Sequence, residues 1–218
     1  MYITEERKQA VPFSDPFLHV YASVLMDKNK LNLTTPEITS ARDLVHQRVF
    51  KYGTLNTGVI IHALKTTNDT DYKRMWQTML NNKSLFARQN KLGIERVRRE
   101  RYAYVIPSVI ADYVARQAPC DLVVIDRFLM HRKFSLAFPP KSELVEEMNM
   151  CIQELKDRNR LKQLYDKWWK DKNHCSSGDS IISAWKSNSN DGNTTLFGVL
   201  NVILNVSSCF VAYMVVRY

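Results

Sequence analysis

Residues 49 to 65 read VFKYGTLNTGVIIHALK. The β-branched and aromatic residues at 49–52 predict a short strand that ends at Gly53. Gly58 then precedes the apolar-periodic run 59–65, which predicts a helix. Only a few polar residues connect the two, so this stretch predicts a strand–turn–helix unit.

The same alternation continues on both sides of this unit. Strands are predicted over 17–26, 103–106 and 122–125, and helices over 59–65, 71–79, 93–101 and 109–116. Two amphipathic helices are predicted within 142–169, with a break near residues 157–159. Because short strands alternate with helices, the sequence predicts an α/β fold.

The chain has 218 residues and a net charge of +9, which raises the possibility of nucleic-acid binding. The basic residues, however, are spread along the chain. The densest cluster, from Arg96 to Arg101, also contains Glu100 and follows Glu95. This pattern is typical of a solvated helix face with i,i+4 ion pairs, so no nucleic-acid partner is expected.

An uncharged apolar segment covers residues 196–216. As a helix it would be about 31 Å long, which matches the hydrocarbon core of a bilayer. It follows a polar linker at 176–195, and the alternative is a buried helix of a soluble domain. Arg217 lies just past the span, so we expect the C-terminus in the cytoplasm and the preceding lobe outside the cell.

Several tripeptides match the acceptor pattern for N-linked glycans, which agrees with a secretory location. Their asparagines are Asn32, Asn68, Asn82 and Asn193. The first seven residues are not a signal peptide. We therefore expect the chain to start within a domain or to insert by its C-terminal anchor alone.

Catalytic and metal-binding signatures are absent from the sequence. The four cysteines, Cys120, Cys151, Cys175 and Cys209, lack the close paired spacing of a zinc site, and the five histidines show no metal spacing. There is no Ser-His-Asp pattern and no Gly-rich phosphate loop. We expect no cofactor, no metal and no enzymatic activity.

Several runs occur in an order that is specific to one receptor family. They are Phe13-Ser14-Asp15-Pro16-Phe17, Lys51 to Gly58, Tyr72 to Trp76, Pro119-Cys120-Asp121 and Lys167 to Cys175. With the apolar segment after them, the chain closely resembles the ligand-binding and C-terminal region of ionotropic glutamate receptors. The resemblance covers nearly the whole chain.

This resemblance implies a lobe like that of the type II periplasmic binding proteins, within an incomplete clamshell and followed by one transmembrane helix. Residues 1–32 would be the end of the first ligand-binding segment and 33–175 the second segment. The linker 176–195 and the membrane helix 196–216 would follow. Complete subunits carry pore helices between the two segments, whereas here Lys28 is followed after a few residues by Thr35. The pore is therefore expected to be missing.

The resemblance also assigns site residues. Arg7 matches the arginine that binds the ligand's α-carboxylate; the alternative is a surface arginine. After Gly58, Val59 and Ile60 replace a hydroxyl pair that binds glutamate. Pro107 replaces the acidic residue that binds the ligand's ammonium group.

Two further expectations concern residues beyond this set. Asp112 lies within a predicted helix and is not expected to substitute for the missing acid. Cys120 and Cys175 match the family's disulfide, which would stabilise the fold by about 4 kcal/mol.

The predicted function is that of an ionotropic glutamate receptor-like subunit or fragment with a degenerate amino-acid site. The alternative is a non-conducting, single-pass ligand-binding or chemosensory module. The expected partners are a small-molecule ligand, such as an amino acid, other receptor subunits in a tetramer, and the cell membrane.

Overall fold

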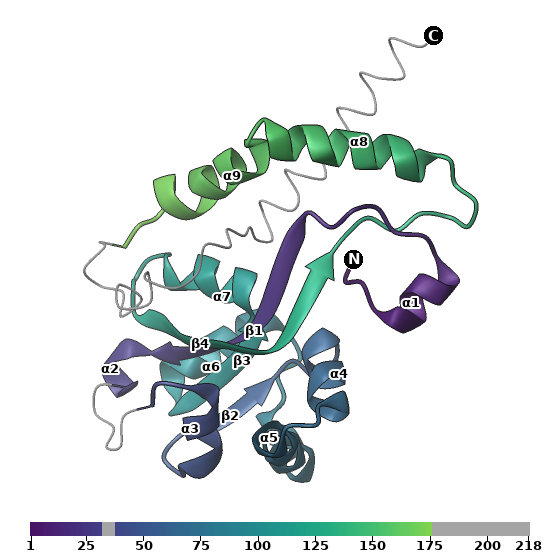
Figure 1. Ribbon diagram of the computed structural model, residues 1–218. Coiled ribbons are helices and arrows are strands. Elements are labelled where there is room, and N and C mark those ends of the chain that lie inside the picture. Colours follow the sequence, from purple (N-terminus) through teal and green to yellow (C-terminus); the bar gives the residue numbers. More distant parts are fainter. Residues whose placement is uncertain (32–37, 176–218) are drawn as a thin grey trace. The chain divides into compact units, whose positions relative to one another are not determined.

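The structure is a computed structural model that describes residues 1–31 and 38–175 (Figure 1). The described residues form two compact units. The first unit contains residues 1–20 and 132–172, and the second contains residues 21–31, 38–131 and 173–175. Strands β1 (Leu18–Asp27) and β4 (Leu122–Phe134) each continue from one unit into the other.

Within the described chain, the strands form one four-stranded mixed sheet in the order β2-β3-β1-β4. Strand β2 (Lys51–Thr54) runs parallel to β3 (Tyr102–Pro107), with Thr54 opposite Val105. Strand β3 runs antiparallel to β1, with Ala22 opposite Pro107. Since parallel neighbours need a crossover, the helices between β2 and β3 are required by this order.

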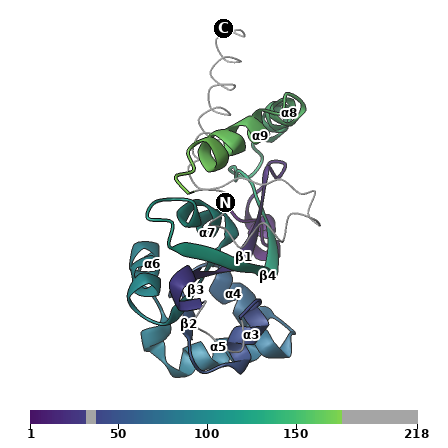
Figure 2. The same cartoon turned by 90° about the vertical axis from the view of Figure 1, so that its left-hand side faces the viewer.

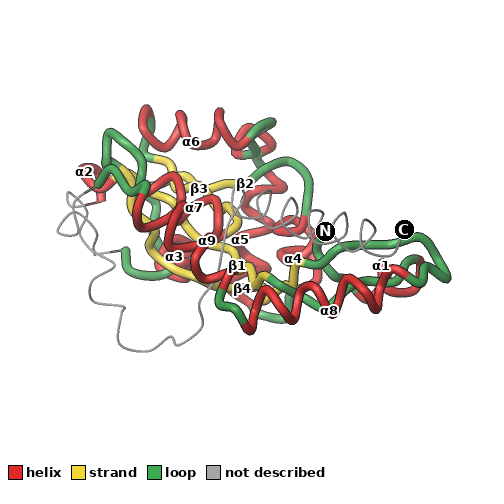
Figure 3. Tube along the Cα trace, turned by 90° about the horizontal axis from the view of Figure 1, so that it is seen from above, coloured by secondary structure: helices red, strands yellow, loops and turns green. Residues whose placement is uncertain are grey.

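The crossover consists of α4 (Val59–Thr66), α5 (Thr70–Asn81), the 3₁₀ turn η1 (Lys83–Leu85) and α6 (Asn90–Arg99). Helix α5 begins where it does because the Asp69 carboxylate accepts hydrogen bonds from the N–H groups of Asp71 and Tyr72. Helix α6 lies on one side of β2 and β3, whereas α4 and α3 (Ala41–His46) lie on the other (Figures 2 and 3). The predicted strand–turn–helix unit is confirmed.

The core of the second unit is centred on β3. Its residues from Tyr102 to Ile106 are all buried, as a strand covered on both faces requires. The Tyr102 hydroxyl donates a hydrogen bond to the Leu85 carbonyl at 2.5 Å. Any side chain at Gly53 would collide with these two groups, so glycine is required for β2 to lie against η1.

Two shorter helices complete the second unit. Helix α7 (Ser108–Ala115) follows β3, and α2 (Lys28–Leu31) follows β1. The Lys30 ammonium group donates hydrogen bonds to three carbonyls at the end of α6, those of Val97, Arg98 and Glu100, at 2.7, 2.7 and 3.0 Å. A cation at a helix C-terminus satisfies unpaired carbonyls and offsets the helix dipole, so α2 stabilises α6.

The first unit contains α1 (Glu5–Ala10), α8 (Leu144–Asp157), α9 (Arg160–Tyr165) and the π-helix η2 (Asp166–Asp171). Asn159 has a φ of 53°, a left-handed conformation that separates α8 from α9. This confirms the break predicted near residues 157–159. Trp169 is fully buried and stacks on Tyr165, as a packing role requires.

Candidate functional site

The candidate site in the second unit lies where β2 and β3 end. Because these strands are parallel and Thr54 pairs with Val105, their carboxyl ends meet at the same edge of the sheet. Helices α4 and α7 begin immediately beyond this edge, after Gly58 and Pro107. In open α/β sheets, ligands bind outside the carboxyl ends of the strands, and helix N-termini there offer unpaired N–H groups.

Gly58 sets the start of α4. Its φ of 103° and ψ of −167° are accessible only to glycine, and a Cβ added there would meet no atom within 4 Å. The Gly58 carbonyl accepts the first helical bond, from His62 N–H at 3.2 Å. No side chain of residues 1–31 or 38–175 caps this N-terminus. The turn therefore leaves the first amides of the helix open to solvent or to a ligand.

The side chains that follow Gly58 are apolar. Val59 is half-buried and Ile60 is 4% exposed, so Ile60 contributes to the core. Neither side chain can donate a hydrogen bond. At this helix start, only backbone N–H groups remain to bind an anion.

Pro107 ends β3 and precedes the first turn of α7. It is half-buried and opposite Ala22 of β1, and it carries neither a backbone N–H nor a charge. The next residue, Ser108, is buried, and its hydroxyl accepts a hydrogen bond from Tyr21 N–H at 3.2 Å. Sequence reasoning did not single out Ser108; a serine at the start of a predicted helix was the available signal.

Asp112 lies on α7, a little more than one turn after Pro107. It is 6% exposed, and its carboxylate pairs with the Arg127 guanidinium at 2.7 Å. Burial raises the pKa of Asp112, while the neighbouring cations Arg127 and Arg116 act in the opposite direction. This carboxylate is enclosed and ion-paired, so it does not present a free anion at the sheet edge.

Arg7 belongs to the first unit, on α1. It is exposed, and its guanidinium donates to the Tyr2 carbonyl at 3.0 Å through Nη1. Among the described residues this is the one hydrogen bond of the guanidinium, which has five N–H donors in all. The role predicted for Arg7 in carboxylate binding stays a prediction.

Cys120 and Cys175 form a disulfide with a Cα–Cα distance of 5.4 Å, as the family resemblance implies. The residue before Cys175 is also tied to the second unit, because His174 N–H donates to the Arg116 carbonyl at 3.0 Å. The bridge therefore attaches the end of the described chain to the segment after α7.

The basic cluster on α6 is partly neutralised by acids. Arg98 forms two hydrogen bonds with the Asp121 carboxylate, at 2.7 and 3.1 Å, and Arg96 pairs with Glu100 at 2.9 Å. Arg96 also covers the Tyr102 ring at 4.3 Å. These contacts agree with a solvated helix face.

Two of the candidate glycan acceptors lie in the described chain. Asn68 and Asn82 are both exposed, at the two ends of α5, whereas Asn32 and Asn193 lie outside the described residues. Within residues 1–31 and 38–175, no three His, Cys, Asp or Glu side chains are grouped so that they could hold a metal ion. None of the helices in those ranges is both long and apolar enough to cross a bilayer. The predicted linker 176–195 and membrane helix 196–216 lie outside the described residues.

Comparison with known proteins gives a consistent set of relatives. The family model "Bacterial extracellular solute-binding proteins, family 3" matches residues 1–171. The chain is 30% identical over 184 residues to "Glutamate receptor ionotropic, kainate glr-3" of Caenorhabditis elegans, covering 84% of this chain and 21% of that protein. It is 31% identical over 144 residues to "Glutamate receptor 3" of Rattus norvegicus, covering 65% and 16%.

A solved structure is also similar. The structure titled "Drosophila muscle GluRIIB complex with glutamate" matches with a TM-score of 0.68 and 27% identity. The match covers 78% of this chain and 66% of that one. The chain spans about a fifth of the length of the curated relatives it matches.

Proposed function

The chain belongs to the bacterial extracellular solute-binding proteins, family 3, in its ionotropic glutamate receptor-like branch, and we propose that it is a receptor-type ligand-binding lobe whose amino-acid site is degenerate. The α/β fold is that of the periplasmic binding proteins. The relatives are receptors and not enzymes, in agreement with the prediction from sequence.

The observation that carries the proposal is that, among the described residues, the end of β3 offers no unpaired acidic residue for a ligand ammonium group. Pro107 occupies the end of β3, where the resemblance implies an acidic residue, and the next acid along the chain, Asp112, is buried and paired with Arg127. A desolvated ammonium group without a counter-charge is strongly unfavourable. We therefore expect the site to lack the preference for α-amino acids that complete family sites have.

The replaced hydroxyl pair supports the same conclusion. With Val59 and Ile60 at the start of α4, two hydrogen bonds to a charged ligand are lost, each worth about 1.5–3 kcal/mol. The backbone amides at the start of α4 remain as anion-binding groups in the second unit. The proposed ligand is thus a small molecule that carries an anionic group and does not require an ammonium group for binding.

Titration with a matched pair of ligands tests this proposal. Glutarate is glutamate without its ammonium group, so the ratio of the two affinities isolates the ammonium contribution. We expect the full 218-residue chain to bind glutamate no more tightly than glutarate in isothermal titration. A preference for glutamate of about tenfold or more, worth 1.4 kcal/mol, would refute the degenerate site.

We further propose that this chain conducts no ions by itself. Only residues 28–40 separate the end of β1 from the start of α3, whereas one membrane span needs about 20 residues. No pore of two helices and a re-entrant loop fits between the two ligand-binding segments. Whole-cell recording from cells that express this chain alone should show no agonist-gated current, and a robust current would overturn this part of the proposal.

The same short connection favours a second candidate function, a non-conducting chemosensory or accessory module. In this form the lobe would be extracellular and anchored by residues 196–216, and it would act through other receptor subunits. Co-expression with a conducting subunit separates the two candidates. An accessory module should alter the ligand response of the assembled channel, whereas an isolated fragment should leave it unchanged.

A further inference from the structure

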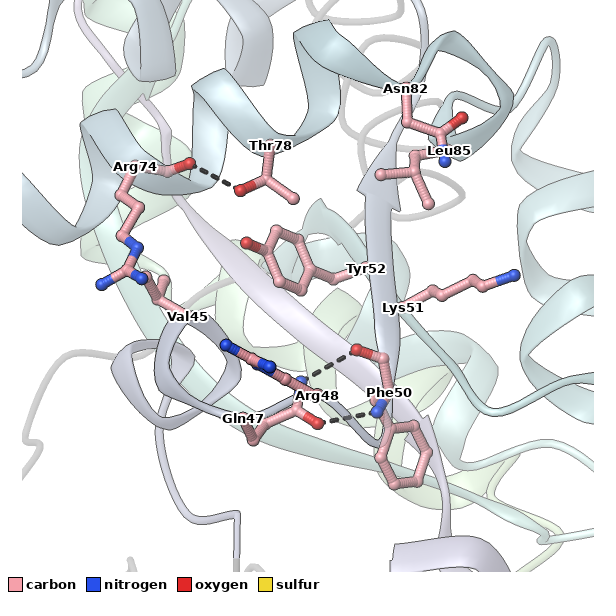
Figure 4. Close-up of a pocket in the computed structure, with 10 residues that line it drawn as sticks. All are labelled: Val45, Gln47, Arg48, Phe50, Lys51, Tyr52, Arg74, Thr78, Asn82 and Leu85. Atoms are coloured by element: carbon pink, nitrogen blue, oxygen red, sulfur yellow. Dashed lines mark hydrogen bonds between the residues drawn. The ribbon is translucent and has the colours of Figure 1, made fainter.

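A groove lies at the opposite end of β2 from Gly58. It has a volume of about 340 Å³ and is formed by the segment before β2, the first residues of β2 and one face of α5 (Figure 4). Its lining residues include Arg48, Lys51, Tyr52, Arg74, Thr78 and Asn82. The volume falls within the range of small-molecule sites.

The charges in this groove have one sign. Arg48, Lys51 and Arg74 line it, and no acidic residue does so in the described part of the chain. Their side chains form no ion pair with any residue in the ranges 1–31 and 38–175. In Figure 4 the Arg74 guanidinium lies to the left of Tyr52 and the Arg48 guanidinium lies below it, whereas the Lys51 side chain extends to the right. Since like charges around one cavity repel, an anion bound there would offset that repulsion.

Tyr52 adds a hydrogen-bond donor to the groove. The residue as a whole is 6% exposed, and its hydroxyl makes no hydrogen bond to any other described residue. In Figure 4 this hydroxyl points into the groove, toward the space beside Thr78. Among the described residues, this hydroxyl is not one of the buried polar atoms that lack a partner, so water can reach it, and a ligand oxygen in the groove would accept its hydrogen bond in place of water.

The groove is rigid where the cations are attached. The Gln47 amide donates to the carbonyls of Leu44 and Phe50 at 3.0 and 2.8 Å and accepts from Phe50 N–H at 2.7 Å. These three bonds fix the turn that carries Arg48. On α5, Arg74 and Thr78 are one turn apart, and the Thr78 hydroxyl donates to the Arg74 carbonyl at 3.0 Å. Little backbone entropy would be lost when a ligand binds.

We propose that this groove binds a small organic anion, with a carboxylate or phosphate head and a short apolar or aromatic body. The guanidinium groups of Arg48 and Arg74 would bind the head, because their planar forks match these oxyanions. The Tyr52 hydroxyl would donate a further hydrogen bond. The body would lie along the apolar lining, which includes Val45 and Leu85. This site uses none of the residues of the proposed amino-acid site.

The test uses phenyl phosphate, with benzoate as the carboxylate counterpart, titrated into the full chain at 150 mM salt. Benzyl alcohol supplies the body without the anion, and inorganic phosphate supplies the head alone. We expect saturable binding of phenyl phosphate or benzoate, and weaker binding of both partial ligands. Equal binding of benzyl alcohol would overturn the requirement for an anion. The absence of binding by both aromatic anions would overturn the site.

Single substitutions in the groove test which residues bind the ligand. Arg48→Gln and Arg74→Gln should each weaken binding about five- to tenfold, and Tyr52→Phe about threefold. Arg99→Gln is the matched control, because it removes the same charge from an exposed position on α6 outside the groove. Thermal unfolding of each variant should match that of the parent. If Arg99→Gln weakens binding as much as Arg48→Gln, the attraction is non-specific and the proposal is wrong.

Discussion

The Arg127 guanidinium of β4 lies 2.7 Å from the buried Asp112 carboxylate of α7. This ion pair joins an edge strand of the sheet to the helix that follows Pro107. Asp112 is the one acidic residue of α7. Because it is held in this ion pair, α7 offers no unpaired carboxylate to a ligand.

Replacement of Arg127 by glutamine should destabilise the protein in a pH-dependent way. Burial raises the pKa of Asp112, and the loss of the Arg127 charge would raise it further. The stability that protonated Asp112 contributes is fully present below its pKa in the unfolded state, about 3.9. It is lost as the pH rises through the pKa of Asp112 in the folded state. We expect a loss of about 1–3 kcal/mol at pH 7, because the partner is partly exposed, and a smaller loss near pH 4.

Urea unfolding of Arg127→Gln at several pH values measures this effect. Arg99→Gln, which removes an exposed arginine from α6, is the control and should show a small, pH-independent change. A loss that stays constant from pH 7 to pH 4 would show that Asp112 does not depend on Arg127.

The disulfide should contribute strongly to stability. It closes a loop with a sequence separation of 55, so replacing Cys120 and Cys175 together by alanine should cost about 4 kcal/mol. Cys151→Ala, at a half-buried helical position, is the matched control and should cost less than about 2 kcal/mol. Equal unfolding midpoints of the double variant and the parent would contradict a stabilising role.

Gly58 should be sensitive to the smallest side chain. Alanine at this position must adopt a φ of 103° and a ψ of −167°, at a cost of about 1–3 kcal/mol, although its Cβ would have open space. Thr57→Ala, at the exposed neighbouring residue, should be close to neutral. If Gly58→Ala unfolds at the same denaturant concentration as the parent, the start of α4 does not require glycine.

The local pattern of the chain predicted most of the second unit. Apolar periodicity gave α4, α5 and α7 nearly at their observed bounds, because each helix buries one face against the sheet or a neighbouring helix. The strand predicted at 103–106 is β3, whose buried residues form an uninterrupted apolar run. For these helices and this strand, which are defined by the burial of apolar side chains, the sequence pattern was sufficient to predict the element and its approximate bounds.

Strand β4 differs from its prediction. Residues 122–125 were expected as a four-residue strand, whereas β4 extends to Phe134. Its second half contains Arg127, His131, Arg132 and Lys133, which obscure the apolar signal. Because β4 is at the edge of the described sheet, backbone pairing on one side holds it and charged side chains are tolerated.

Contacts between distant segments could not be predicted from local patterns. The pairing of Cys120 with Cys175 came from family resemblance, because four cysteines allow several pairings. The contact of Lys30 with the end of α6 joins residues about 70 positions apart. Arg48, Tyr52 and Arg74 meet in one groove only because β2 and α5 pack together, so none of them stood out in the sequence.

In the proposed site, Pro107 removes the contact with the ligand ammonium group. The direct test is the ratio of glutamate to glutarate affinity for Pro107→Glu, with Pro107→Gln as an uncharged control of similar size. We predict that Pro107→Glu raises the preference for glutamate about tenfold or more over the parent chain, since a charged hydrogen bond contributes about 1.5–3 kcal/mol, and that Pro107→Gln does not. An unchanged ratio in Pro107→Glu, or a parent chain that already prefers glutamate as strongly, would contradict the account.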